Sequence, residues 1–348
     1  MNILMTTAER RGRQGDGHFL KKPLHFIPKT KCCKHTQTGG DFLKYIDTKI
    51  SSAHEARLIV RESEENFTAA LDNALDTVIH GHIDRETSGC KIITLSGPTC
   101  SGKTTTANKL IRMITESGYH AVVMSIDDFF IDRARTNDIN GEMPDYDSVK
   151  AIDLAEFGLC VKGLMEGKPT LIPHYDFVTG KRDSYAEYYP TRKDIFIFEG
   201  IQAVYPEVVR FLGSDFKSIF IHVDDDVTAD GVLMRSDEIR LCRRLVRDYR
   251  FRNALPEFTL YLWENVRANE RENIYPNAGN CHVYINSFLE YELFILAKNV
   301  LPLLETVSKD SPYRDEADEV AEKLRHFLNP HFDESMIPEN SVFREFIG

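Results

Sequence analysis

The sequence lacks any long apolar segment. It contains no apolar run of 18 residues, and the nearest approach, 288–304, includes Glu290, Glu292 and Lys298. A membrane-spanning helix needs about 20 predominantly apolar residues, so we expect no transmembrane segment and no membrane partner. The N-terminus also lacks the apolar core of a secretory signal. These absences lead us to expect a cytoplasmic protein.

A regular cysteine framework is also missing. The seven cysteines are odd in number and irregularly spaced, which favours a reduced intracellular protein over a disulfide scaffold. The run Cys32-Cys33-Lys34-His35 has no second ligand pair at the spacing of a zinc site. We therefore expect no metal site there.

Positive charge is scarce overall. The net charge of the 348 residues is −11, which argues against a general nucleic-acid binder. Residues 1–40 are the exception, because they contain eight Lys and Arg and only two acidic residues, Glu9 and Asp16. We interpret this stretch as a flexible basic tail, with an interaction arm as the alternative. Nothing in the sequence fixes the oligomeric state, and a homo-oligomer is compatible with it.

The strongest motif lies in the first third of the chain. An apolar strand (92–95) leads into Gly97-Pro98-Thr99-Cys100-Ser101-Gly102-Lys103-Thr104-Thr105, and a helical pattern follows. Gly97, Gly102, Lys103 and Thr104 match G-x-x-x-x-G-K-[ST]. Backbone N–H groups of such a loop cradle phosphates, the lysine reaches the β- and γ-phosphates, and the threonine hydroxyl binds Mg²⁺. The motif thus predicts an ATP site with Mg²⁺ as cofactor.

Apolar strands alternate with helical patterns through most of the chain. The expected strands are 92–95, 121–126, 170–177, 195–200, 218–223 and 281–285. The expected helices include 64–80, 239–252, 258–269, 288–304 and 313–328. Continuous apolar strands that alternate with helices predict a mostly parallel sheet covered on both faces. The fold class is therefore a three-layer α/β/α P-loop fold with helical extensions at both ends.

Two acids end expected strands. Asp127 follows the strand after the P-loop helix, and Glu199 ends the next long apolar strand. The carboxyl ends of parallel strands line the ligand crevice, so both acids could hold Mg²⁺, and Asp127 could accept a proton from an acceptor hydroxyl. The alternative is that each is a helix cap or turn residue.

Six arginines occupy residues 240–252. Arg240, Arg243, Arg244 and Arg247 repeat at helical spacing and predict one cationic face. Such a face suits a lid over polyphosphate. A solvated basic face paired with the acidic body is an equally weighted alternative.

Residues 90–305 resemble the phosphoribulokinase/uridine kinase branch of P-loop kinases, and within it the uridine–cytidine kinases. Besides the P-loop, the blocks that carry the likeness are Ser125-Ile126-Asp127-Asp128-Phe129-Phe130, Ile172-Pro173-His174-Tyr175-Asp176-Phe177 and Phe198-Glu199-Gly200-Ile201. The segment around Tyr146-Asp147 and the arginine-rich helix also follow the family pattern. The resemblance implies the fold and activity of an ATP-dependent nucleoside kinase.

The resemblance also implies roles by position. Asp127 matches the catalytic aspartate and Glu199 an acid of the magnesium shell, beside Thr104. Asp147 matches the carboxylate that holds the ribose hydroxyls, while Tyr175 and Phe177 match residues of the base pocket. Arg244 matches a substrate-contacting arginine. Arg247 and Arg252 match lid arginines, and with Lys103 we expect Arg247 to act on the transferring phosphoryl group.

One departure concerns the base. Uridine–cytidine kinases carry a base-reading histidine a few residues after the Tyr-Asp-Phe strand, where this chain has Gly180. Residues 253–261 also depart from the family's lid. Both differences affect the choice of nucleoside more than phosphoryl transfer.

The sequence therefore predicts a kinase that phosphorylates the 5′-hydroxyl of a nucleoside, uridine or cytidine by resemblance. The alternatives are a related kinase acting on a sugar phosphate or a pantothenate-like alcohol, and an ATP-binding module without turnover. No [NT]-K-x-D guanine-reading loop occurs in the chain. The expected organisation is a basic tail (1–40), a helical extension (41–88), a kinase domain (89–305) and a C-terminal helical extension (306–348).

Overall fold

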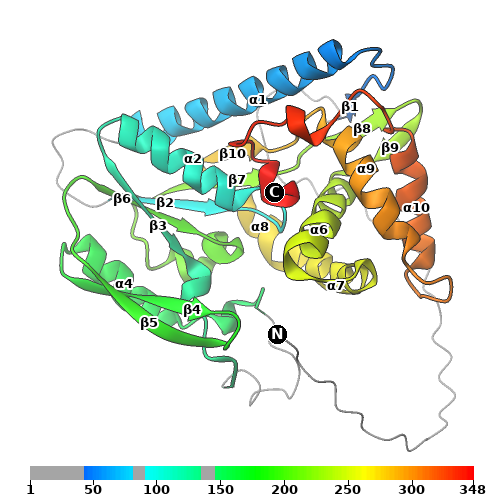
Figure 1. Ribbon diagram of the computed structural model, residues 1–348. Coiled ribbons are helices and arrows are strands. Elements are labelled where there is room, and N and C mark those ends of the chain that lie inside the picture. Colours follow the sequence, from blue (N-terminus) through cyan, green and yellow to red (C-terminus); the bar gives the residue numbers. More distant parts are fainter. Residues whose placement is uncertain (1–42, 81–90, 135–145) are drawn as a thin grey trace, which may run out of the picture.

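The computed structural model describes residues 43–80, 91–134 and 146–348. Figure 1 shows a central sheet with helices on both faces. The expected basic tail, with its Cys32-Cys33 pair, and residues 81–88 of the expected helical extension lie outside the described residues.

The central sheet has five strands in the order β10-β7-β2-β6-β3, and every neighbouring pair is parallel. Its strands are β2 (Lys91–Ser96), β3 (His120–Ser125), β6 (Asp194–Glu199), β7 (Lys217–His222) and β10 (Val283–Asn286). The middle position of β2 brings the P-loop to the centre of the sheet's carboxyl edge. In open parallel sheets this edge is where ligands bind.

Alternating side chains of the strands feed two hydrophobic cores. Ile93 and Ile197 belong to the core under one face of the sheet, whereas Ile92, Phe196 and Phe198 belong to the core under the other. This division follows from the period of two along a strand. It explains why the strands read as continuous apolar runs, since both faces are covered.

Helices cover both faces, which confirms the predicted three-layer fold class. The first core receives α1 (Ala53–Leu75), α2 (Lys103–Glu116), α6 (Ser236–Arg252), α7 (Pro256–Asn269), α9 (Glu292–Glu305) and α10 (Arg314–Arg325). The second core receives α4 (Leu154–Met165), α5 (Pro206–Val209) and α8 (Tyr275–Ala278). No helix of the described residues is long and apolar enough to cross a bilayer.

Two small sheets lie outside the central one. The expected strand 170–177 forms β4 (Thr170–Asp176), which pairs antiparallel with β5 (Lys181–Tyr188) rather than joining the parallel sheet. The sequence did not predict β5 because its residues are mostly exposed and polar. A second small sheet joins β1 (Leu43–Tyr45), β8 (Asp226–Ala229) and β9 (Val232–Met234).

Several helix bounds differ from expectation. The helix expected at 64–80 begins at Ala53, where Ser52 caps it, and ends in a π-helical turn, Asp76–His80. The helix expected to begin at residue 288 begins at Glu292. The shorter elements are the 3₁₀ turns Ile126–Phe129, Val149–Ala151, Ile201–Val204 and Glu334–Met336, the π-helical turn Glu270–Ile274, and α11 (Arg344–Ile347).

The C-terminal segment packs into the main core. Phe332 stacks on Phe294 of α9 with ring centroids 4.2 Å apart, and Val342 and Phe346 are fully buried. In Figure 1 the C-terminus lies beside α2 and α6. The C-terminal segment therefore lies close to the P-loop. The predicted division of the chain into four parts stays a prediction.

Candidate active site

The P-loop connects β2 to α2 and admits no side chain at its two key glycines. A Cβ on Gly97 would lie 2.0 Å from the Ile221 carbonyl oxygen, and one on Gly102 would lie 2.4 Å from Val342 Cγ2. Gly102 also has a φ of +90°, in the left-handed region that glycine tolerates best. The close approach of Ile221 and Val342 thus requires glycine at these two positions of the loop.

Two buried arginines of α6 hold the carbonyl oxygens of the loop. Arg240 Nη1 donates to Thr99 O at 3.2 Å, and Arg243 Nη1 donates to Cys100 O at 3.0 Å. In a trans peptide the next N–H points the opposite way from the carbonyl. The N–H groups of Cys100 and Ser101 therefore point away from these arginines.

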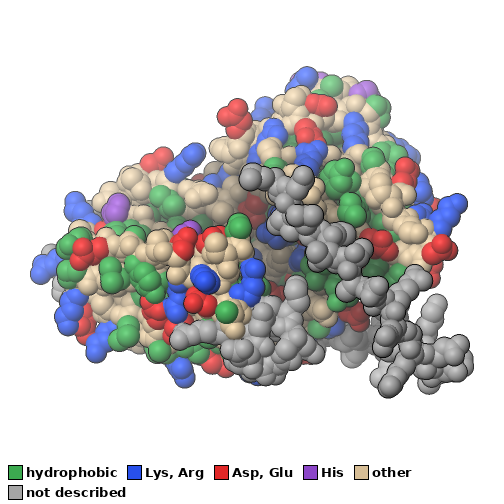
Figure 2. All heavy atoms as spheres, turned by 60° about the horizontal axis from the view of Figure 1, so that its bottom comes forward, with side chains coloured by type: hydrophobic (Ala, Val, Ile, Leu, Met, Phe, Trp, Pro, Cys, Tyr) green, Lys and Arg blue, Asp and Glu red, His purple; other side chains and the backbone are tan. Residues whose placement is uncertain are grey.

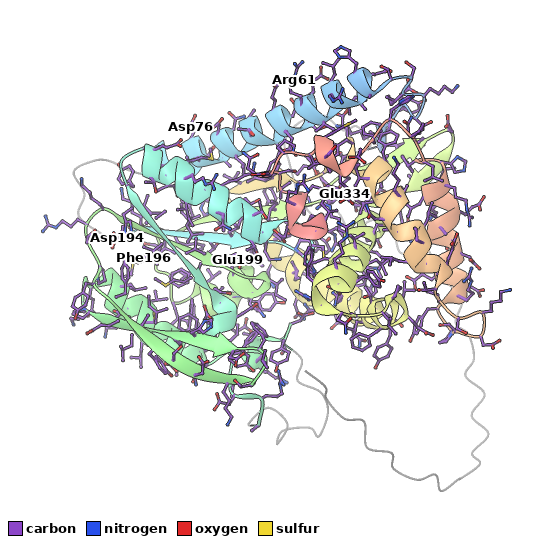
Figure 3. All side chains as sticks on the ribbon, viewed as in Figure 1. Arg61, Asp76, Asp194, Phe196, Glu199 and Glu334 are labelled. Atoms are coloured by element: carbon purple, nitrogen blue, oxygen red, sulfur yellow. The ribbon has the colours of Figure 1, made fainter. Side chains whose placement is uncertain are left out.

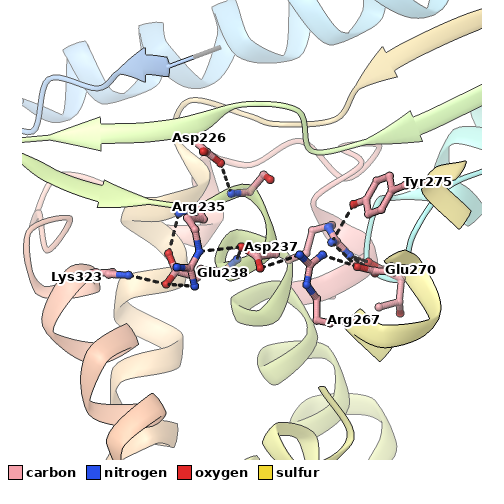
Figure 4. Close-up of polar contacts among 11 residues, drawn as sticks. Asp226, Arg235, Asp237, Glu238, Arg267, Glu270, Tyr275 and Lys323 are labelled. Carbon is pink, nitrogen blue, oxygen red and sulfur yellow. Dashed lines mark hydrogen bonds and ion pairs between the residues drawn. The ribbon is translucent and has the colours of Figure 1, made fainter. Parts of the chain in front are cut away.

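Both arginines are neutralised by buried carboxylates. Arg240 makes a two-pronged pair with Glu270, at 2.5 and 2.9 Å, and Arg243 does so with Glu292, at 2.7 and 3.1 Å. Glu270 also accepts from Arg267 at 2.6 Å (Figure 4). Planar guanidinium groups suit such bidentate pairing.

These contacts correct the predicted cationic face of α6. Arg240 and Arg243 are about 1% and 0% exposed, so they are neither lid residues nor a solvated basic face. The helical spacing was right, but it could not show that acidic residues of later segments would cover this face.

The three arginines predicted to contact substrate or phosphate all lie close to the carboxylate of Asp248. Arg244 Nε donates to Asp248 at 3.1 Å, Arg247 Nη2 at 2.7 Å, and Arg252 Nη1 lies 3.5 Å from the same carboxylate. Their roles toward substrate and phosphate stay predictions. Asp248, which organises them, was not singled out from the sequence.

Lys103 folds back over its own loop. Its Nζ donates to Gly97 O and Pro98 O, each at 3.0 Å. Thr104, the predicted magnesium ligand of the motif, is exposed. Ser101 Oγ is buried and has no hydrogen-bond partner among the described residues. The loop thus offers a lysine, an exposed hydroxyl and an unpartnered buried hydroxyl, a donor set that fits a polyphosphate chain.

The two strand-end acids meet beside this loop. Glu199 ends β6 (Figure 3), and Asp127 lies in the 3₁₀ turn that follows the neighbouring strand β3. The pKa of Asp127 is raised to about 7, mainly by burial and also by the charge of Glu199, while the charge of Lys103 acts in the opposite direction. Burial also raises the pKa of Glu199. Two buried acids with raised pKa values next to a lysine are suited to binding a cation or accepting a proton.

A cluster of aromatic side chains lies next to Asp128. Tyr175 is buried, its backbone N–H donates to Asp128 Oδ1 at 3.1 Å, and its ring packs edge-on against Phe130 and Phe177. Tyr146 OH lies 3.3 Å from Tyr175 OH. The expected base-pocket residues Tyr175 and Phe177 are therefore in contact.

Asp147 lies near the same acids. Its charge contributes to the raised pKa of Asp127, and its carbonyl oxygen accepts from Tyr205 OH at 3.1 Å.

Figure 2 shows the molecule hollowed between the part that carries β4 and β5 and the helical part that carries α6 and α7, with acidic and basic side chains at the floor.

Arg133 occupies the space that Gly180 leaves open. A Cβ on Gly180 would lie 2.8 Å from Arg133 Cβ and Nε. Arg133 Nε donates to Tyr146 OH at 2.9 Å, and Nη2 donates to Phe177 O at 2.7 Å. The position predicted to lack a base-reading side chain is thus filled from another segment by a guanidinium, which the sequence analysis did not identify.

Comparison with known proteins assigns the family. Residues 92–293 match the model of the phosphoribulokinase/uridine kinase family. The chain belongs to this family, which confirms the resemblance seen in the sequence.

Two curated relatives are similar to this chain over part of their length. Uridine-cytidine kinase 2-B of Danio rerio is 28% identical over 183 residues, which cover 50% of this chain and 62% of that protein. Uridine kinase of Saccharomyces cerevisiae is 29% identical over 251 residues, covering 65% and 46%. The chain thus spans about half to three-fifths of the length of these relatives. D-glycerate 3-kinase from Cryptococcus neoformans, a solved structure, aligns with 84% of this chain and 87% of its own, at 13% identity and a TM-score of 0.32.

The pKa of Asp127 predicts a pH-dependent effect of Asp127→Asn on stability. Because the folded-state pKa lies above the ordinary value of 3.8, the contribution of Asp127 to stability is complete below pH 4 and is lost as pH rises through about 7. Asparagine stays neutral, so the variant should gain melting temperature relative to wild type between pH 5 and pH 8.5. We expect about 2–4 °C for each kcal/mol recovered.

Thermal unfolding followed by circular dichroism, without nucleotide or Mg²⁺, measures this difference. Asp215→Asn is the matched control, since Asp215 is exposed in the turn before β7, at the opposite edge of the sheet. Its melting temperature relative to wild type, measured at the same pH values, gives the baseline for removing one carboxylate. A pH-independent difference for Asp127→Asn would show that this carboxyl titrates normally.

Proposed function

We propose that the protein is an ATP-dependent kinase that phosphorylates the 5′-hydroxyl of a nucleoside, uridine or cytidine. The observation that carries this proposal is the meeting of the P-loop, Asp127 and Glu199 at one edge of the sheet. Membership of the phosphoribulokinase/uridine kinase family supports the reaction class. The names of the two relatives support a nucleoside as acceptor.

Phosphates of ATP would bind along residues 97–105. Lys103 would exchange its contacts with Gly97 O and Pro98 O for phosphate oxygens and balance their charge. Arg247, whose Nη2 donates to Asp248 at 2.7 Å, is the candidate for a second cation. Arg240 and Arg243 would act only as positioning residues, since the loop and two carboxylates occupy them.

Mg²⁺ would be held jointly by the protein and the nucleotide. Across residues 43–80, 91–134 and 146–348, no group of three His, Cys, Asp or Glu side chains could hold a metal alone. Thr104, Glu199 and Asp127 would each contribute an oxygen, and the phosphates would complete the shell. When bound, the ion neutralises charge on the phosphates.

Asp127 is the proposed general base. A pKa near 7 leaves part of this carboxyl ionised at neutral pH and able to accept a proton. It would take the 5′-hydroxyl proton as that oxygen bonds to the γ-phosphorus and the bond to the β-phosphate oxygen breaks, leaving ADP. Asp147 would hold the ribose hydroxyls, and Tyr175, Phe177, Arg244 and Arg252 would contact the rest of the nucleoside.

A nucleoside panel tests the proposal. ADP release with ATP and Mg²⁺ should be stimulated by uridine or cytidine but not by 5′-deoxyuridine, which lacks the accepting hydroxyl. Asp127→Asn should fold as wild type yet lose about 100-fold or more in turnover, the usual range for a lost general base. Asp215→Asn should turn over like wild type.

Two results would contradict the proposal. If ATP binds and no acceptor stimulates ADP release, the chain is a nucleotide-binding module without turnover. If Asp127→Asn keeps near-wild-type turnover, Asp127 has no part in the chemistry.

A second candidate is a kinase for an alcohol that carries a negative charge. Arg133 supports it, because its guanidinium lies against Gly180 and beside the aromatic cluster, where a neutral base would otherwise be read. Guanidinium groups bind carboxylates and phosphates strongly. A sugar phosphate and pantothenate are therefore included in the acceptor panel.

If this second candidate is right, an anionic acceptor will give the highest kcat/KM. Arg133→Gln should then raise the KM for that acceptor about 10- to 100-fold while leaving the KM for ATP unchanged, as expected for loss of a charge-assisted pair. Arg192→Gln, at an exposed arginine before β6, is the matched control. Preference for a neutral nucleoside would reject this candidate.

A further inference from the structure

The C-terminal segment places a carboxylate on the first turn of the P-loop helix. Glu345 Oε2 accepts a hydrogen bond from the backbone N–H of Thr105 at 3.0 Å, across 240 positions of sequence. Thr105 is the third residue of α2, and the α2 N-cap, Gly102, has no side chain that could satisfy this turn. The first N–H groups of a helix lack partners within the helix and attract anions.

Packing fixes the backbone from which Glu345 projects. Val342 is fully buried against Gly102, and the centroid of the Phe346 ring lies 4.9 Å from the guanidinium carbon of Arg243. Arg250 of α6 donates to the carbonyl oxygen of Ile347. Glu345 itself is only half-buried. Its side chain can therefore leave Thr105 by rotation while the segment stays packed.

The charge of Glu345 acts on the rest of the site as well. Burial is the largest cause of the raised pKa of Glu199, and the charge of Glu345 contributes to it. Glu345 also helps to raise the pKa of Arg247, where burial acts in the opposite direction and Cys100 and Asp248 act in the same direction. Glu345 thus lies among the groups proposed to surround the phosphates.

We propose that Glu345 is an internal competitor for the phosphate-binding turn, so that the C-terminal segment weakens nucleotide binding. A carboxylate and a phosphate oxygen are both anionic acceptors for the Thr105 N–H, and one N–H cannot serve both at full strength. A phosphate that uses this turn displaces Glu345, and its affinity is lowered by the cost of breaking that contact. This inference rests on the proposed nucleotide site.

The alternative role for a carboxylate here is to help hold a magnesium ion. The two roles predict opposite effects of removing the charge, because a competitor weakens nucleotide binding and a ligand strengthens it. The sign of the change in affinity therefore distinguishes them.

Calorimetric titration of the full chain with ADP, and with ATP and Mg²⁺, tests the proposal. Glu345→Gln and Glu345→Ala should each bind nucleotide about tenfold more tightly than wild type, the scale of one charge-assisted hydrogen bond. Glu339→Gln, at an exposed position six residues earlier, should bind as wild type. Without nucleotide, Glu345→Ala should melt at a lower temperature, because α2 loses its capping contact.

The outcomes separate this inference from the proposed function. Wild type that binds ATP, with unchanged or weaker binding by both Glu345 variants, overturns the competition and leaves the nucleotide site standing. Binding that appears only in the variants supports it most strongly. Absence of nucleotide binding in wild type and variants alike contradicts both proposals.

Discussion

The site depends on two buried ion pairs that lie behind the P-loop rather than in it. These pairs are almost completely buried and join Arg240 to Glu270 and Arg243 to Glu292. Each arginine also donates one hydrogen bond to a carbonyl oxygen of the loop. Burying charged groups is costly unless each is paired and hydrogen-bonded. Here the loop carbonyls complete that pairing. The loop and the ion pairs therefore require one another.

This arrangement explains the position of the remaining charges. Buried carboxylates neutralise the arginines that hold the loop. The remaining charged groups beside the loop include Lys103 and two acids, Asp127 and Glu199, and burial disfavours the ionised form of both acids. Such a site gains stability when a cation enters with an anionic ligand. The geometry thus suits a nucleotide that arrives with a divalent ion, and Glu345 supplies the anion that the loop helix otherwise attracts.

The sequence predicted the features that are local or that follow from sheet topology. The P-loop is a contiguous motif, and Asp127 and Glu199 lie together because parallel strands end at one edge. Features that depend on distant segments were not predictable in the same way. Helical spacing placed Arg240 and Arg243 on a common face, but only the fold brings Glu270 and Glu292 onto them. The same holds for Glu345, whose contact spans 240 positions, and for Arg133, which fills the space beside Gly180.

The direct test of phosphoryl transfer is phosphorus NMR of the products formed with ATP, Mg²⁺ and the best acceptor of the panel. The account predicts that ADP and one phosphomonoester appear in equal amounts, that both depend on the acceptor, and that inorganic phosphate stays at the level without enzyme. Formation of ADP with an equal amount of inorganic phosphate, and no phosphomonoester, would contradict it, because the γ-phosphoryl group would then pass to water.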